Sequence, residues 1–333
     1  MKTKSPRSAV SFPRVALASI GLLLQAACTQ ASVTADLPAT AGTPGRTEND
    51  ESVARAKAVL MKVMTQERSW KQVHAAEALI AVGESVAVRT VFANEPEAAD
   101  LADYRIGIWR VRAAIALSRP ERKQWLNKIE AAFCDPRSPD RLDAIESLSK
   151  LGFAVSGETL AKVRQLAATA PEGDKLFALW ALAKAEEPGA IERIIAALDS
   201  TDIFARQRAA YALRWLHVES MPVKQGLVRA VQAEPVDTYP YVYLLSAALV
   251  LDADPSQRGL WRGKLEKVLA TGPASARFEA IQCLMTGYGR ADVPRLAPML
   301  QDGETDTRIS AAWGILSIQN REQGLKTEAR RAP

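Results

Sequence analysis

The chain has 333 residues, of which 48% are hydrophobic and 24% are charged. This composition is normal for folded proteins and excludes disorder over most of the length. Only one apolar run is long enough to be considered for a membrane segment, so a polytopic membrane protein is excluded. Three Cys and two His residues leave little material for a structural zinc cluster or a disulfide framework.

The first 27 residues have the features of a secretory signal peptide. They begin with four basic residues and no acidic ones. An apolar stretch follows over residues 15–24, and two alanines stand directly before Cys28. About ten apolar residues are too few for a membrane span, which needs about 20. We therefore expect residues 1–27 to direct export and to be removed.

The sequence Gln25-Ala26-Ala27-Cys28 resembles the lipobox of bacterial lipoproteins. In that family the Cys is acylated and becomes the new N-terminus, and Gln25 departs from the Leu that usually stands at its position. The resemblance implies a lipid on Cys28, and Thr29 is compatible with export to the outer membrane, facing the periplasm. Two alternatives stay open: a soluble periplasmic protein, or an intracellular scaffold if residues 1–27 are not a signal.

Residues 28–50 are rich in Ala, Thr, Pro and Gly and have no periodicity, which predicts a flexible linker. The formal charge of +5 depends on the leader, because residues 1–27 contain four Lys or Arg and no acid. The remaining 39 basic and 38 acidic residues nearly balance. Nucleic-acid binding needs a basic patch, so it is not expected.

From about residue 51 a six-residue phrase recurs whose second residue, here called the anchor Ala, is the same in every copy. Successive copies are 31 to 38 residues apart, a period typical of stacked solenoid repeats rather than of one globular core. The copies are HAAEAL (74–79), RAAIAL (112–117), DAIESL (143–148), FALWAL (177–182), RAAYAL (208–213), SAALVL (246–251), EAIQCL (279–284) and SAAWGI (310–315).

The small anchor Ala lets neighbouring helices approach closely, and the apolar residue four positions later lies on the same stripe. A second helix with its own apolar spacing precedes each phrase, for example over residues 160–167 and 190–198. No convincing alternating strand pattern is present. We predict an all-α solenoid of about eight helix pairs over residues 51–319, followed by a polar tail over 320–333.

Basic residues recur three positions before the anchor Ala in six copies, and Asp140, Asp174 and Asp306 stand at the matching helix starts. This pattern resembles the HEAT-repeat family, including its bacterial HEAT-like branch. The resemblance implies a right-handed, armadillo-like α-α superhelix that binds with its concave face, but it says little about function. Gln72 and Leu244 depart from the pattern. The six basic residues are Arg110, Arg141, Lys175, Arg206, Arg277 and Arg308.

Helical geometry predicts the concave face from the positions one before, two after and five before the anchor Ala, opposite the buried arc. Arg side chains there suit carboxylate or phosphate groups, and flat aromatic rings suit sugars or peptide side chains. Tyr239, Tyr241 and Tyr243 form a second aromatic group. The alternative is that the aromatic rings pack against the next repeat and the charges only keep the surface soluble. The candidate binding residues are Trp70, His74, Glu77, Arg105, Trp109, Arg112, Asp143, Glu146, Trp180, Arg208, Tyr211 and Glu279.

The acidic residues near His74 offer an acid/base set, but His74 and Glu77 are three positions apart on one helical face, which favours a simple pair. His217 is expected to cap a helix end. No nucleophile, zinc or phosphate-loop motif is present, so no catalytic residue, metal site or cofactor is predicted. Cys134 and Cys283 are expected to be unpaired and mostly buried.

The sequence therefore predicts a non-enzymatic periplasmic binding or scaffold module whose concave face holds a protein segment or an anionic or sugar-containing ligand. It would touch the membrane only through its N-terminal lipid. The alternative is an enzyme, or an accessory lipoprotein to one, with acid/base residues in the N-terminal half of the groove. Convergence of His74, Glu77, Arg105 and Arg112 in one pocket would favour the enzyme, and an open groove would favour the binding module.

Overall fold

The computed structural model describes residues 46–93 and 102–331, and side chains within 48–93 and 102–324. The predicted signal peptide and Cys28 lie outside these residues. Every regular element in the described ranges is helical, which confirms the all-α prediction. None of these helices combines the length and apolar character that a membrane span needs.

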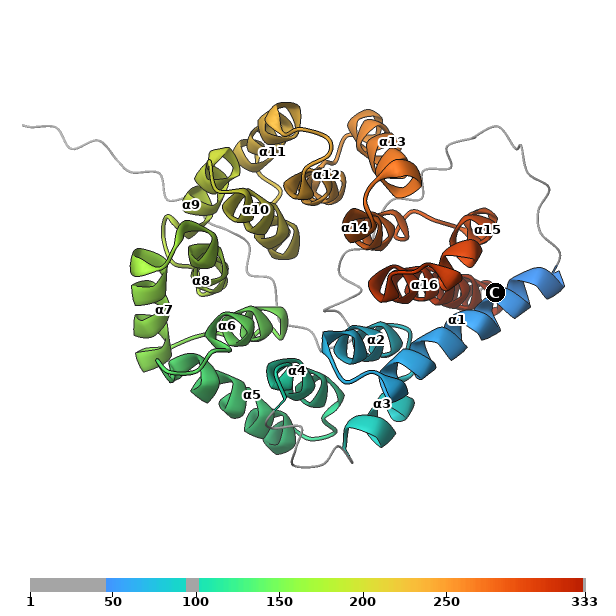
Figure 1. Cartoon of the computed structure of the whole chain (residues 1–333), viewed down its shortest axis with the longest axis horizontal. Helices are drawn as coiled ribbons and strands as arrows, with labels where there is room; N and C mark the ends of the chain where they lie inside the picture. Colours follow the sequence, from blue (N-terminus) through green and yellow to red (C-terminus); the bar gives the residue numbers. More distant parts are fainter. Residues whose placement is uncertain (1–45, 94–101, 332–333) are drawn as a thin grey trace, which may run out of the picture.

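The helices form eight consecutive pairs in which an outer helix precedes an inner one (Figure 1). Short 3-10 turns follow α9 (197–199) and flank α15 (290–292 and 297–301). The outer helices are α1 (Arg46–Gln66), α3 (Ser85–Phe92), α5 (Arg119–Cys134), α7 (Gly157–Thr169), α9 (Ala190–Ala196), α11 (Met221–Ala233), α13 (Pro255–Thr271) and α15 (Val293–Leu296). The inner helices are α2 (Trp70–Ala81), α4 (Arg105–Ile115), α6 (Arg141–Lys150), α8 (Glu172–Lys184), α10 (Ile203–Leu216), α12 (Tyr239–Leu251), α14 (Ala274–Leu284) and α16 (Thr305–Arg331).

Both ends of the helical region extend beyond the predicted boundaries. Helix α1 begins at Arg46, inside the segment 28–50 for which a linker was expected, and α16 continues to Arg331, through most of the predicted polar tail. The reason at the N-terminal end is packing: Asn49 is only 6% exposed, and α1 lies against α16. Periodicity alone did not reveal this, because the partner of α1 is at the other end of the chain.

Helix starts follow the local sequence closely. The side chains of Ser69, Ser118, Asp202 and Asp254 each accept a backbone N–H in the first turn of α2, α5, α10 and α13, which satisfies donors that a helix cannot pair internally. Gly189 precedes α9 with a φ of 78°, a conformation that glycine adopts without strain.

The anchor Ala stripe packs as the repeat predicts. All eight anchor residues are fully buried, on eight different inner helices: Ala75, Ala113, Ala144, Ala178, Ala209, Ala247, Ala280 and Ala311. The apolar residue four positions later is also buried in seven of the eight copies. The exception is Leu117, which is 79% exposed because α4 ends at Ile115, two residues before it. The prediction that Leu117 lies on the same buried stripe as the anchor Ala is therefore wrong.

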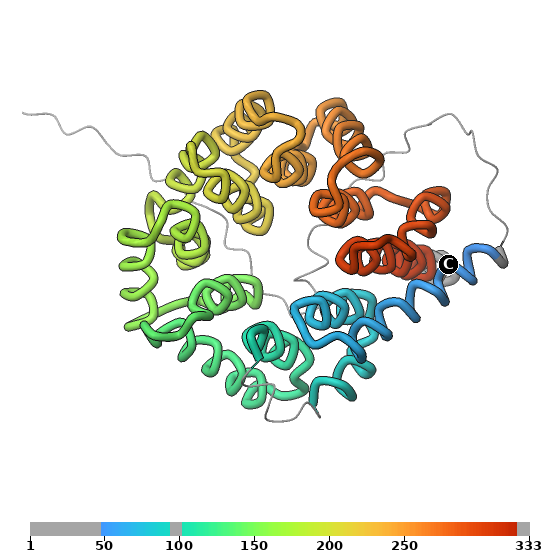
Figure 2. The backbone as a smooth tube through the Cα atoms, viewed as in Figure 1, coloured from blue at the N-terminus to red at the C-terminus, as the bar shows by residue number. Residues whose placement is uncertain are grey.

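The stack curls until its two ends meet, so the solenoid forms a ring, in which the first helices lie beside the last one (Figures 1 and 2). Helix α16 contacts both α1 and α2. Across this junction, which we call the seam, Asn320 Nδ2 donates to the carbonyl oxygen of Val82 at 2.8 Å. His74 Nδ1 lies 2.9 Å from Asp306 Oδ1. The ring turns the predicted concave face into the wall of a central space.

Candidate binding site in the centre of the ring

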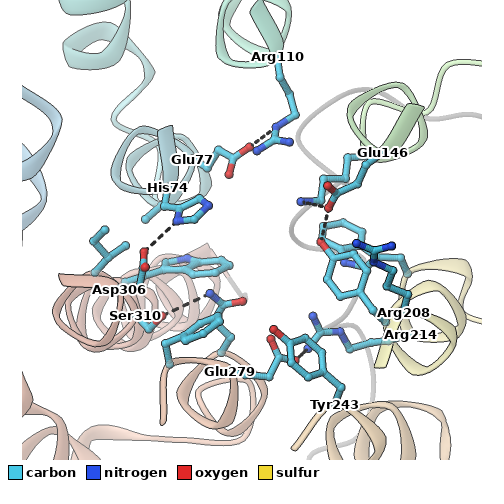
Figure 3. Close-up of a pocket in the computed structure, with 18 of the residues that line it drawn as sticks. His74, Glu77, Arg110, Glu146, Arg208, Arg214, Tyr243, Glu279, Asp306 and Ser310 are labelled. Carbon is cyan, nitrogen blue, oxygen red and sulfur yellow. Dashed lines mark hydrogen bonds and ion pairs between the residues drawn. The ribbon is translucent and has the colours of Figure 1, made fainter. Parts of the chain in front are cut away.

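A cavity of about 520 Å³ lies at the centre of the ring, and each of the eight inner helices contributes to its wall (Figure 3). This volume is within the range of ordinary small-molecule sites. Four acidic and four basic residues line it together with His74, so the formal charges of its wall balance. The acids are Glu77, Glu146, Glu279 and Asp306, and the bases are Arg110, Lys150, Arg208 and Arg214.

Glu77 and Arg110 join neighbouring repeats on the α2–α4 side of the cavity. Arg110 Nε donates to Glu77 Oε1 at 2.6 Å, and Arg110 Nη1 donates to Ser147 Oγ at 3.0 Å. Burial by itself would raise the pKa of Glu77, but the charges of Arg110, Lys150 and His74 outweigh it and the pKa lies below its ordinary value. Glu77 is therefore an ionised acceptor, held by an arginine that is 4% exposed.

Glu146 is the centre of a second network, on the α6 side. Lys150 Nζ lies 2.9 Å from Glu146 Oε1, and the Tyr211 hydroxyl donates to the same oxygen at 3.1 Å. Burial opposes ionisation of Glu146, but Lys150 and Arg110 lower its pKa overall. Burial is also the main reason that the pKa of Tyr211 rises to about 12. These groups keep their ordinary charges at neutral pH.

A third network connects α10 with α14. Arg214 Nη1 donates to Glu279, and it lies 2.9 Å from Cys283 Sγ. Glu279 and Cys283 are almost completely buried. Burial raises the pKa of the Cys283 thiol despite the nearby Arg214 charge, so this thiol stays protonated. Both Cys134 and Cys283 are unpaired as expected; Cys283 is buried, and Cys134 is partly buried.

The seam itself contributes the pair of His74 and Asp306. Burial opposes ionisation of Asp306, but the hydrogen bond and charge of His74, with the charge of Lys71, lower its pKa overall. The His74 side chain is 43% exposed, on the cavity. The ring of Trp70 lies behind it, with centroids 6.4 Å apart. His74 is thus fixed from two sides and open toward the cavity.

Aromatic side chains form the wall opposite α2 and α4. Tyr211, Tyr243 and Tyr239 follow one another edge to face, with centroid separations of 6.3 and 5.2 Å, and the Tyr239 and Tyr243 hydroxyls are 2.9 Å apart. Trp215 packs against Tyr211. The Trp215 indole N–H is buried and has no hydrogen-bond partner among the described residues. This wall therefore consists of flat aromatic faces, and behind them the buried Trp215 indole N–H has no acceptor among the described residues.

Arg208 lies between two further rings of this wall. Its guanidinium carbon is 4.8 Å from the Phe177 ring centroid and 5.9 Å from that of Phe204, while Nη1 donates to Asp174 at 2.6 Å. Phe177, Phe204 and Arg208 all line the cavity, and the Phe204 side chain is also 54% exposed to solvent.

Of the twelve residues that the sequence proposed, the structure brings six together around the cavity: His74, Glu77, Glu146, Arg208, Tyr211 and Glu279. Trp70 and Trp180 stand behind the wall, where Trp70 packs on Arg110 and Trp180 on Tyr211. Asp143 is half-buried on α6, and burial, followed by the charges of Glu146 and Asp140, raises its pKa. None of these last three is part of the cavity lining.

The three proposed residues on α4 lie elsewhere. Arg105 Nε binds Asp140 at 2.7 Å and its guanidinium packs on Trp109. Arg112 Nε donates to the carbonyl oxygen of Phe92 on α3 at 2.9 Å. Convergence of His74, Glu77, Arg105 and Arg112 in one pocket is therefore only half observed. On α4 the cavity is lined instead by Arg110, Val111 and Ala114, which are three and two positions before the anchor Ala and one position after it.

Other cavity residues were missed as candidates. Lys150 and Arg214 stand at the ends of their inner helices, six and five positions after the anchor Ala, beyond the positions considered. Arg110 and Asp306 were noticed only as repeat features. Their sequence signal was a charged residue at a fixed offset from the anchor, which fits a repeat contact equally well. Among the described side chains, no three His, Cys, Asp or Glu are grouped so as to hold a metal ion.

Fold and site together define a closed α-solenoid that surrounds a polar and aromatic cavity. No family model matches the chain, and no curated protein matches it. Among solved structures, the crystal structure of an engineered protein from the Northeast Structural Genomics Consortium is similar at 18% identity, with 81% of this chain and 97% of that chain covered and a TM-score of 0.24. A likeness with that TM-score supports no inference about this chain.

Proposed function

We propose that this protein is a binding module that encloses a small, uncharged, hydroxyl-rich ligand, of the sugar class, in the central cavity. The observation that carries the proposal is the composition of the wall: four acids and four bases, each paired with a protein group, together with several aromatic rings.

A hydroxyl group is both a donor and an acceptor. It can therefore bind at a carboxylate such as Glu77 and equally at a cation such as Arg208, whereas an anion would be attracted by one group and repelled by the other. The C–H face of a sugar ring is flat and apolar, which suits contact with Tyr211, Tyr243 and Trp215.

The ring makes a protein segment the weaker candidate for the occupant. The inner helices surround a cavity of about 520 Å³, which is small for a long protein segment. That volume suits a ligand of one or two sugar rings. A short peptide remains as an outcome of the test.

Tryptophan fluorescence measures binding directly, because Trp215 and Trp313 line the cavity. A panel of neutral mono- and disaccharides is titrated beside glucuronic acid and a neutral tetrapeptide. We expect a neutral saccharide to give a saturable change that Tyr243→Ala weakens at least tenfold. The control is Arg229→Ala, an exposed residue on α11. A response to glucuronic acid or the peptide alone would refute the proposal.

We also propose that the protein is exported and anchored through a lipid on Cys28, and that its repeats belong to the HEAT-like type. Support for the first comes from residues 1–28 of the sequence. Support for the second comes from the eight buried anchor Ala residues and from pairs between successive repeats such as Arg208 with Asp174. Mass spectrometry of the mature N-terminus tests the anchor: a diacylglyceryl-modified Cys28 is expected, and an unmodified terminus would contradict it.

A further inference from the structure

The seam places a histidine in the cavity in the geometry of a general base. His74 Nδ1 lies 2.9 Å from Asp306 Oδ1, although the two residues are 232 positions apart in the chain. The imidazole is fixed by this contact and by Trp70, and its open side is turned to the cavity (Figure 3). A histidine oriented through one nitrogen by a carboxylate is suited to accept a proton at the other.

We propose that His74 and Asp306 form a base dyad that activates water to hydrolyse a carboxylic ester carried by the ligand, such as an O-acetyl group on a sugar. The sugar part rests on the proposed function, and the dyad itself does not.

The tautomer follows from the pair. Because the ionised Asp306 carboxylate can only accept a hydrogen bond, Nδ1 must carry the proton in the neutral imidazole, which leaves the lone pair on Nε2. The charged groups around the dyad are Asp306 on α16, Glu77 and Lys71 on the helix of His74 and, through Glu77, Arg110 on α4. Two carboxylates and two cations thus surround the base.

Water is the nucleophile because the cavity's own nucleophiles are held inactive. The Ser310 hydroxyl accepts from Gln282 Nε2 at 3.3 Å and is 1% exposed. Lys150 is held protonated by Glu146, which raises its pKa above the ordinary value although burial opposes this. Burial raises the pKa of Tyr211 to about 12. None of these three can attack a carbonyl at neutral pH as readily as water bound at Nε2.

Nε2 takes a proton from water while its oxygen bonds to the ester carbonyl carbon, which gives a tetrahedral oxyanion. The bond between the acyl carbon and the sugar oxygen then breaks, and the imidazolium returns the proton to the departing sugar alkoxide. The products are a carboxylic acid and the free hydroxyl. We assign the oxyanion to Arg110, which lines the cavity beside Glu77: Nε and Nη1 bind Glu77 and Ser147, and Nη2 has no hydrogen bond to another described residue.

The chain offers a matched control, since its two histidines are His74 and His217. His217 ends α10 in the left-handed conformation and does not line the cavity. Long-range ¹H–¹⁵N NMR of the full-length protein will therefore show two imidazoles. We expect His74 as the Nδ1–H tautomer above its titration midpoint, and a shifted tautomer ratio in Asp306→Asn. A His74 that stays doubly protonated through pH 8 would be a structural ion pair and would overturn the dyad.

Turnover is measured with 4-nitrophenyl acetate and with an O-acetylated disaccharide over pH 5–9. His74→Gln and Asp306→Asn should each lower the rate at least 100-fold, and His217→Gln should leave it unchanged. Thermal unfolding and small-angle scattering establish that the variants keep the ring.

The outcomes separate the two proposals. If wild type binds the deacetylated disaccharide but hydrolyses neither ester faster than His74→Gln, the esterase is refuted and the binding module stands. If His74-dependent hydrolysis of 4-nitrophenyl acetate occurs without any saccharide binding, the dyad stands and the sugar is wrong. Loss of hydrolysis with retained saccharide binding in Asp306→Asn supports both.

Discussion

Helices α4 and α10 carry almost the same phrase, RAAIAL from Arg112 to Leu117 and RAAYAL from Arg208 to Leu213, but the structure uses them differently. In α10 the arginine lines the cavity and the leucine is fully buried. In α4 the arginine is 9% exposed and lies behind the wall, and the leucine is 79% exposed.

The neighbours of α4 explain the difference. Ala116 is extended, with a ψ of 132°, and Ser118 caps α5 directly afterwards, so the helix ends before the phrase does. Arg112 finds the carbonyl oxygen of Phe92 and the ring of Trp125, 4.8 Å from its guanidinium carbon. Two positions on a helix turn about 200°, so Arg110 faces the cavity when Arg112 faces outward.

A buried anchor Ala therefore predicts a packed inner helix, but it does not predict which of the helix's other side chains face the cavity. Ala113 and Ala209 are equally buried. What differs is the outer layer: α3 and α5 offer Phe92 and Trp125 to one arginine, whereas Arg208 finds Asp174 and two phenylalanines.

The largest expected effect is at the buried end of the α10 phrase. Leu213→Ala removes a fully buried side chain and leaves a cavity between layers, which costs about 2–5 kcal/mol of the free energy of unfolding. Urea unfolding followed by circular dichroism measures it, with Leu117→Ala as the matched position in α4. A loss below 1 kcal/mol would mean that the two ends pack alike.

Arg112→Ala comes next. It removes the donor to the Phe92 carbonyl and the contact with Trp125. An unsatisfied buried acceptor and the lost packing together cost about 2 kcal/mol. Saccharide affinity should not change, because Arg112 does not line the cavity. A stable variant with weakened binding would place this arginine in the site after all.

Arg208→Ala should show the opposite pattern. The Arg208 and Asp174 side chains are 23% and 31% exposed, and a partly exposed ion pair contributes under about 1 kcal/mol to stability. Loss of a cavity donor should lower saccharide affinity about tenfold, equivalent to ~1.4 kcal/mol. Isothermal titration and urea unfolding of the same sample separate the two quantities. Equal losses of saccharide affinity in Arg112→Ala and Arg208→Ala would refute the assignment of Arg208 to the cavity side of α10 and of Arg112 to the outer side of α4.

The sequence was sufficient to predict the features that are set within a single repeat. The anchor Ala, the inner and outer helices and six cavity residues, including His74 and Tyr211, follow from spacing. The rotation of α4 was not accessible, because it depends on Phe92 and Trp125 of the outer layer. On α12 the cavity is likewise lined by Tyr239 and Tyr243, before the phrase begins.

Ring closure was inaccessible for a different reason. Each repeat adds a small rotation, and only their sum decides whether the first and last helices meet. The seam contact of His74 with Asp306 looks in sequence like two unrelated charged positions. In the structure it takes the place of pairs between adjacent repeats, such as Arg208 with Asp174 and Arg105 with Asp140. The sequence showed the partners but not that the first repeat adjoins the last.

The smallest effect is expected at Leu117. Since this side chain is 79% exposed beyond the end of α4, Leu117→Ala should change the free energy of unfolding by less than about 0.5 kcal/mol, although the same substitution at Leu213 costs several times more. The repeat pattern alone assigns both leucines to the same buried stripe and predicts equal losses. A loss at Leu117 comparable with that at Leu213 would show that α4 continues through the phrase in solution, and Arg112 would then have to turn toward the cavity.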